Sequence, residues 1–149
     1  MTGISDLYQE ILLDHNSKPR NFRMPEDATH SVDGHNPLCG DKITLYLTVA
    51  DGVITDAGFQ GSGCAISKAS ASMLTQSVKG QSSARALEIF KAFHQMMTEP
   101  DAELDYDTLG DLESLSGVIE FPTRIKCAVL AWHAMRSALE GQGAAVTSE

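Results

Sequence analysis

Two strand-like segments joined by a two-residue turn constrain the fold of this chain most strongly. Apolar and polar residues alternate through residues 42–50, KITLYLTVA, which is the period of a strand buried on one face. Asp51-Gly52 follows, a dipeptide that favours tight hairpin turns, and residues 53–60 return as a second strand. A shorter strand is expected near residues 29–33. The chain therefore contains an antiparallel hairpin with one face that other elements must cover.

Helix-period patterns supply that cover. Gly80 and Gly141 suit helix ends, Pro122 suits a first helical turn, and Ser82 or Ser83 can cap a helix. In the last helix, the predicted core stripe consists of Ile125, Ala128, Val129, Trp132 and Leu139. Residues 99–107 read as an acidic surface loop, and residues 141–149 as a disordered tail. The predicted helices cover residues 5–16, 64–79, 83–97, 109–117 and 122–140.

Length and composition exclude several classes of protein. The chain has 149 residues, enough for one domain, which we expect over residues 1–140. No run of about 18 apolar residues could span a bilayer, and no secretory signal is visible, so we expect a cytoplasmic protein. The net charge of -9 repels phosphate backbones, which argues against nucleic-acid binding. In a reducing compartment the three cysteines stay as thiols, which suits metal binding or sulfur chemistry.

Two of the cysteines lie where the chain changes direction. In Cys39-Gly40-Asp41 the thiol and the carboxylate are two residues apart, so in an extended backbone both point to the same side and can face one metal ion. Cys64 follows Gly-Ser-Gly at the junction of a strand and a helix, where free amide groups and the helix dipole favour a thiolate. A turn cysteine or a small buried residue is the alternative at each position.

Cys127 lies in the first turns of the last helix, away from the predicted core stripe. Arg124 and Lys126 flank it, and nearby cations lower the pKa of a thiol. Together with Cys39, Asp41 and Cys64 it could complete a four-coordinate site. Three thiolates and one carboxylate suit tetrahedral Zn2+, and thiolate-rich ligation also suits an iron–sulfur cluster. The histidines show no metal-binding spacing, and none is assigned as a ligand.

Five segments of the chain match a known pattern: LYQEILLDHNSKPRNF, NPLCGD, GFQGSGCAISKASASMLTQSVKG, LGDLESLSGV and FPTRIKCAVLAW. Together they resemble the iron–sulfur cluster assembly family of IscU, SufU and NifU N-terminal domains. Three of these segments contain one cysteine each. Lys126 occupies the position before the last cysteine where IscU-like members have a histidine, and the stretch between Gly80 and Phe121 is longer than in those members. Both features resemble the SufU branch.

The resemblance implies a compact α+β domain in which a three-stranded antiparallel sheet packs against helices. It also implies a tightly held Zn2+ and a SufS-type cysteine desulfurase as partner, with downstream iron–sulfur assembly proteins or apoproteins as acceptors. By analogy, Cys39 accepts persulfide sulfur while Asp41, Cys64 and Cys127 retain the zinc, and Arg124 orients the partner or stabilises charge. Zinc would hold Cys39 as a thiolate and mask its nucleophilicity until the partner docks.

Two other functions remain open on the same residues. The chain could be a non-enzymatic scaffold on which a [2Fe-2S] cluster is built and then transferred to apoproteins. It could also be a zinc-stabilised interaction domain without sulfur chemistry. The leading hypothesis is a zinc-dependent sulfurtransferase.

Overall fold

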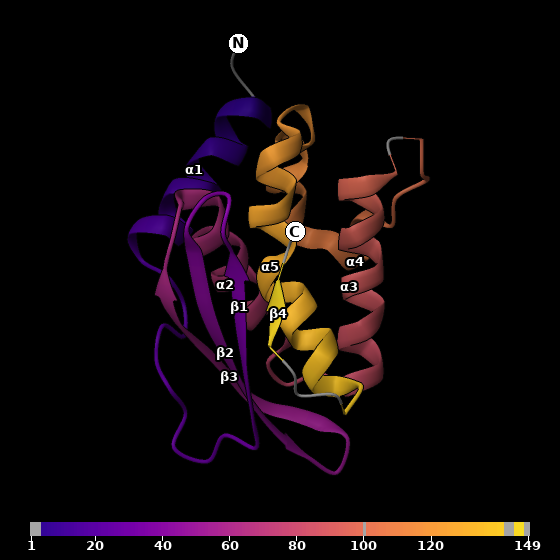
Figure 1. Cartoon of the computed structure of the whole chain (residues 1–149). Helices are drawn as coiled ribbons and strands as arrows, with labels where there is room; N and C mark the ends of the chain where they lie inside the picture. Colours follow the sequence, from indigo (N-terminus) through magenta and orange to yellow (C-terminus); the bar gives the residue numbers. More distant parts are fainter. Residues whose placement is uncertain (1–3, 100, 142–144, 148–149) are drawn as a thin grey trace.

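The two strands predicted on either side of Asp51-Gly52 form the centre of the sheet. β2 (Asp41–Ala50) and β3 (Val53–Ser62) pair antiparallel, and both turn residues adopt positive φ. β1 (His30–Asn36) pairs antiparallel with the other edge of β2. Figure 1 shows this arrangement in the computed structural model, which describes residues 4–99, 101–141 and 145–147, with side chains from residue 8 onward.

The sheet has a fourth strand that was not predicted from the sequence. β4 (Val146–Thr147) pairs in parallel with Gly34 and His35 of β1, which gives the strand order β3-β2-β1-β4. The expected three-stranded sheet is therefore corrected to four strands with one parallel pair. β4 falls within the tail predicted to be disordered, of which residues 142–144 and 148–149 lie outside the described residues. A two-residue strand has no measurable period, so no local pattern could indicate it; its place is set by the free edge of β1.

The helices begin and end close to the predicted positions. Ser82 caps α3 by accepting a hydrogen bond from the N–H of Arg85, and Pro122 is the first residue of α5. The acidic loop ends earlier than predicted, in a one-turn helix. The helix predicted over residues 109–117 is a 3-10 helix. The bounds are α1 (Ile4–Ser17), α2 (Ala65–Val78), α3 (Ser83–Thr98), α4 (Tyr106–Leu109), η1 (Gly110–Glu120) and α5 (Pro122–Leu139).

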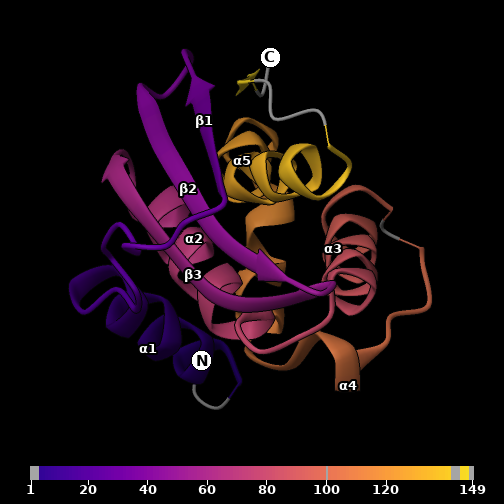
Figure 2. The same cartoon turned by 90° about the horizontal axis from the view of Figure 1, so that it is seen from below.

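The helices cover one face of the sheet in layers. α2 and α5 lie side by side against the sheet, α1 packs on α2, and α3 packs on the far side of α5 (Figure 2). Leu45, Leu47 and Phe59 point inward from the sheet, while Trp132 of α5 stacks on Phe93 of α3 with ring centroids 4.9 Å apart. Within the described ranges, no helix is both long and apolar enough to cross a bilayer.

The central position of α5 corrects the predicted core stripe. Ile125 and Leu139, which the stripe included, are only partly buried, whereas Cys127, which it excluded, is 1% exposed. A helical-wheel stripe assumes a surface helix with one covered side, but α5 contacts the sheet, α2 and α3 and is buried nearly all round. Cys127 is therefore a buried thiol. Its chemical properties depend on the residues packed around it in the fold more than on the residues next to it in the sequence.

Candidate metal centre

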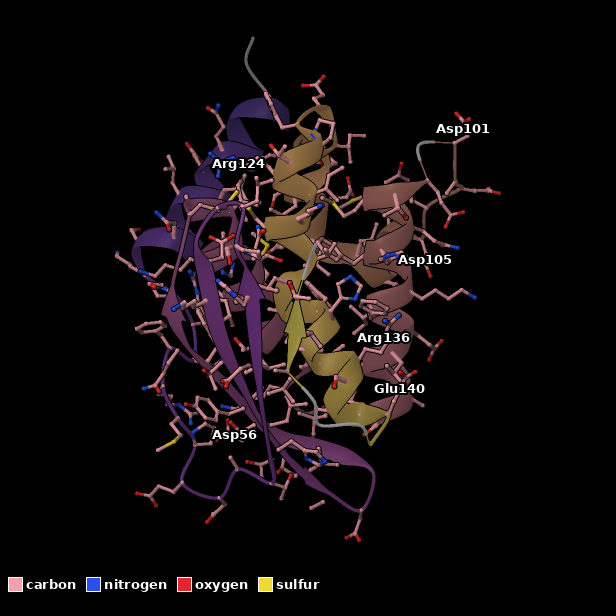
Figure 3. All side chains as sticks on the ribbon, in the orientation of Figure 1. Asp56, Asp101, Asp105, Arg124, Arg136 and Glu140 are labelled. Atoms are coloured by element: carbon pink, nitrogen blue, oxygen red, sulfur yellow. The ribbon has the colours of Figure 1, made fainter. Side chains whose placement is uncertain are left out.

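One end of the sheet gathers the candidate ligands. Asn36 ends β1 and pairs with Asp41, the first residue of β2, so the turn between them holds Cys39 at the sheet end. Gly40 has a φ of +73°, a left-handed conformation that glycine adopts without strain. Arg124, at the start of α5, lies at this same end of the molecule (Figure 3). Three separate parts of the chain thus meet here: the β1–β2 turn and the N-termini of α2 and α5.

Three of the four predicted ligands come together. Ligand atoms of Cys39, Asp41 and Cys127 all lie within 4.8 Å of one another. In a tetrahedral zinc site with metal–ligand bonds of about 2.0–2.3 Å, neighbouring ligand atoms are about 3.3–3.8 Å apart. The observed spacing is thus close to that of a coordinated set, and the donor chemistry of two thiols and a carboxylate fits Zn2+.

Cys64 lies beside this group rather than within it. Its sulfur caps α2 by accepting the N–H of Ser67 at 3.4 Å, and its own N–H donates to Oδ1 of Asp41 at 2.8 Å. The side chain of Cys64 is also close enough to Cys127 to raise the pKa of its thiol. The predicted placement at a helix N-terminus is confirmed, and this fourth donor is held next to the other three.

The Cys127 thiol has the most perturbed environment in this group. Burial raises its pKa, and hydrogen bonds with Asp41, Cys39 and Cys64 raise it further. The charges of Arg124 and Lys126, its neighbours along the chain, predicted a lowered pKa, and that prediction is wrong. Desolvation outweighs those charges at a residue that is 1% exposed. A bound cation would reverse this preference, since a coordinating thiol is deprotonated.

The two glycines before Cys64 permit a close approach, whereas the sequence pattern predicted only a strand break there. A Cβ on Gly63 would lie 2.5 Å from Oδ1 of Asp41. A Cβ on Gly61, where φ is +141°, would lie 2.0 Å from the carbonyl oxygen of Lys42. Gly-Ser-Gly therefore lets β3 and the start of α2 press against the buried carboxylate of Asp41.

Asn36 is a further residue of the centre that was not predicted from the sequence. Its side chain is fully buried, and Nδ2 donates to Oδ2 of Asp41 at 3.1 Å and to Sγ of Cys127 at 3.3 Å. Its inward orientation could have been found from the period of two in β1, where Val32, Gly34 and Asn36 alternate with exposed residues. The hydrogen bonds could not have been found, because they depend on the pairing of β1 with β2 and on how α5 packs against β1.

Arg124 is exposed and lies over the turn. Its Nη1 is 3.8 Å from the sulfur of Cys39, at the outer limit of a hydrogen bond to sulfur. The pKa of its guanidinium is raised by a hydrogen bond with Cys127 and by the charges of Cys64 and Cys39. The structure thus places this predicted supporting residue beside the thiols.

An apolar cleft of about 610 Å³ adjoins the centre. Its lining includes Tyr8, Leu12, Ile66, Phe121 and Arg124, so one cation is shared between the cleft and the thiol group. The acidic loop lies elsewhere: in Figure 3, Asp101 and Asp105 lie beyond α3, across α5 from Arg124. A partner that covers the centre would therefore contact the cleft before the loop.

Comparisons with known proteins identify the family of this chain. The model of the NifU-like N-terminal domain family matches residues 7–128. Over 133 residues the chain is 44% identical to the zinc-dependent sulfurtransferase SufU of Bacillus subtilis, covering 89% of each chain. It is 36% identical over 140 residues to the iron–sulfur cluster assembly scaffold protein IscU of Streptococcus pyogenes, covering 94% of this chain and 87% of that one.

Solved structures show the same fold. An iron–sulfur cluster assembly scaffold protein for the SUF system from Fervidobacterium islandicum superposes with a TM-score of 0.83 at 33% identity, covering 92% of this chain and 99% of that one. The resemblance drawn from the sequence motifs is thereby confirmed. The chain belongs to the NifU-like N-terminal domain family.

Proposed function

We propose that this protein serves iron–sulfur cluster assembly as a zinc-dependent sulfurtransferase that accepts persulfide sulfur from a SufS-type cysteine desulfurase. The observation that carries the proposal is the convergence of Cys39, Asp41 and Cys127 within 4.8 Å at the end of the sheet. The similarity to the Bacillus subtilis SufU supports the choice of zinc and of sulfur transfer.

The donor set fits a zinc ion held by Cys39, Asp41, Cys64 and Cys127. When bound, zinc would keep the thiols deprotonated at neutral pH. The protein keeps the carboxylate of Asp41 oriented by hydrogen bonds to both of its oxygens, from the N–H of Cys64 and from Asn36. Oriented ligands of this kind bind a metal ion without having to be ordered first.

Local structure separates the sulfur acceptor from the retained ligands. Cys127 is buried, whereas Cys39 and Cys64 are both partly exposed. Of these two, the Cys64 sulfur caps α2, while Cys39 lies in the turn between β1 and β2. In the transfer, the Cys39 thiolate attacks the terminal sulfur of the partner's cysteine persulfide. A new S–S bond forms on Cys39, the partner's S–S bond breaks, and the partner's cysteine leaves as a thiolate, so no external oxidant or reductant is needed.

Arg124 supports this step electrostatically. Its guanidinium lies over Cys39 and is free to meet a partner, since the side chain is exposed. A cation at this position favours the thiolate form of the acceptor and attracts the negative charge that builds up on the leaving sulfur.

A second candidate function uses the same residues. A thiolate-rich site can hold a [2Fe-2S] cluster, and the relatives include proteins named IscU scaffolds. In that case the protein would assemble a cluster and transfer it to apoproteins. Anaerobic reconstitution with iron and sulfide, followed by timed transfer to an acceptor apoprotein, separates the two functions. Efficient transfer by zinc-free protein favours the scaffold.

Desulfurase turnover tests the leading proposal. Purified SufS-type desulfurase receives cysteine with wild-type protein or with Cys39→Ser, and the zinc content of each sample is measured. The wild type should raise turnover and gain a sulfur atom on the Cys39 peptide by mass spectrometry, while Cys39→Ser should do neither. Equal stimulation and equal sulfur acceptance by Cys39→Ser would show that another group is the acceptor.

A further inference from the structure

We propose that Asn36 is a positioning residue for the metal centre: its side-chain amide fixes the carboxylate of Asp41 and the sulfur of Cys127 in relation to each other. This inference rests on the metal centre of the proposed function. It assigns to Asn36 a role that depends on contacts formed only in the folded chain.

The position of Asn36 makes it a link between two elements. It ends β1 on the inward face of the sheet, directly opposite Asp41 in the β1–β2 pairing. Cys127 comes from α5, which packs against β1. The side chain of Asn36 is 0% exposed, so water does not compete for its hydrogen bonds. Asp41 and Cys127 are far apart in sequence, and Asn36 contacts both.

The side-chain amide of Asn36 has one N–H group for each of these two partners. A side-chain amide nitrogen carries two N–H groups, and here one is directed to Oδ2 of Asp41 and the other to Sγ of Cys127. If the amide were flipped, its oxygen would face a carboxylate and a sulfur, and both are acceptors when ionised. The hydrogen-bond partners thus determine the orientation of the amide.

The remaining polar atom of Asn36 argues against a purely structural role. Its Oδ1 is buried and makes no hydrogen bond within the part of the chain that the structure describes. An unpaired buried carbonyl oxygen destabilises a fold, so an apolar residue would serve packing better at this position. The amide is explained by what its nitrogen does for Asp41 and Cys127.

The same geometry completes the support of the carboxylate. Oδ1 of Asp41 accepts the N–H of Cys64, and Oδ2 accepts the amide of Asn36. Loss of Asn36 leaves only one of these hydrogen bonds and frees the carboxylate to rotate. Loss of hydrogen-bond partners behind metal ligands typically lowers metal affinity by about 10–100-fold.

The inference is tested by measuring the zinc affinity of Asn36→Ala and comparing it with that of a matched control variant. Ser72→Ala is the control, because Ser72 is also 0% exposed and its Oγ also makes two hydrogen bonds, to His15 and to the N–H of Arg20. Ser72 lies eight residues beyond Cys64 along the chain, about 12 Å along α2. The measurements are zinc dissociation constants from chelator competition, the absorption spectrum of the Co2+-loaded protein, and thermal melting of the metal-free protein.

Asn36→Ala should bind zinc about 10–100-fold more weakly than the wild type and shift the d–d bands of bound Co2+. Ser72→Ala should match the wild type in zinc affinity and in Co2+ bands, although it should melt at lower temperature without metal, because His15 and the N–H of Arg20 lose their partner. The inference is overturned if Asn36→Ala binds zinc within about twofold of the wild type with unchanged Co2+ bands, or if Ser72→Ala loses as much affinity.

Two further measurements keep the test decisive. If metal-free Asn36→Ala does not fold, Asn36→Leu replaces it, since this variant keeps a side chain of similar size but has no N–H donor and adds no metal ligand. Zinc binding by Asn36→Leu that equals or exceeds that of the wild type overturns the inference. Wild-type protein without thiolate-to-Co2+ charge-transfer bands would overturn the metal centre itself, a result distinct from failure of Asn36 alone.

Discussion

Gly63→Ala should disable the candidate metal centre without removing any candidate ligand. The added Cβ would lie 2.5 Å from Oδ1 of Asp41, while ordinary van der Waals contact begins at 3.4 Å, so the carboxylate or the backbone must shift by about 0.9 Å. Metal–ligand distances tolerate changes of only about 0.2 Å. A displacement of this size also breaks the hydrogen bond from the N–H of Cys64 to the same oxygen.

The expected loss can be stated for both metal binding and folding. Zinc affinity should fall by at least about 10–100-fold, the loss seen when the support of a ligand is removed. Overpacking of the metal-free fold should lower the free energy of unfolding by about 1–3 kcal/mol. Chelator competition measures the first quantity, and urea unfolding of the metal-free protein measures the second.

Gly117→Ala is the matched control for this substitution. A Cβ at Gly117 meets no atom within 4 Å, and Gly117 does not have a left-handed φ. This variant should bind zinc as the wild type does and be slightly stabilised, because alanine restricts the unfolded chain. Should Gly63→Ala bind zinc within about twofold of Gly117→Ala, the close packing of Gly63 against Asp41 would not matter for the centre.

Three other perturbations follow from contacts outside the ligand set. Arg124→Ala should slow sulfur acceptance roughly tenfold at low salt and less at high salt, while zinc content stays unchanged; Arg85→Ala, remote from the centre, should match the wild type. Burial lowers the pKa of His15 and of His133, so the folded state resists protonation. The stability that these two neutral histidines contribute should be fully present above pH of about 6.5 and lost as pH falls through their lowered folded pKa values. Melting temperatures measured across this pH range should show the loss, and they should depend less on pH in His15→Gln and His133→Gln. Tyr8, whose pKa a hydrogen bond to a carboxylate of η1 raises to about 12, joins α1 to η1. Tyr8→Phe should lower the free energy of unfolding by about 1 kcal/mol in urea, and an unchanged midpoint would contradict that role.

Local patterns were sufficient to predict most of the secondary structure. The alternation through β2, the Asp51-Gly52 turn and the helix-ending glycines act within a few residues, so the sequence carries them directly. β4 was missed because its position depends on an edge of β1 that exists only after folding. The environment of Cys127 was misjudged for a related reason: the buried side of a helix follows from its neighbours in space, and α5 has neighbours on nearly every side.

The candidate ligands can be recognised from the sequence more easily than the residues that hold those ligands in place. A cysteine or an aspartate indicates its chemistry by residue type, so Cys39, Asp41, Cys64 and Cys127 could be proposed from the sequence alone. Asn36 and Gly63 carry no such chemistry, and their importance comes from distances to Asp41 that the fold alone determines. A transplant of the four ligands onto another hairpin and two helices would therefore bind zinc poorly unless it also reproduced a buried amide donor and a residue without a Cβ at these two places.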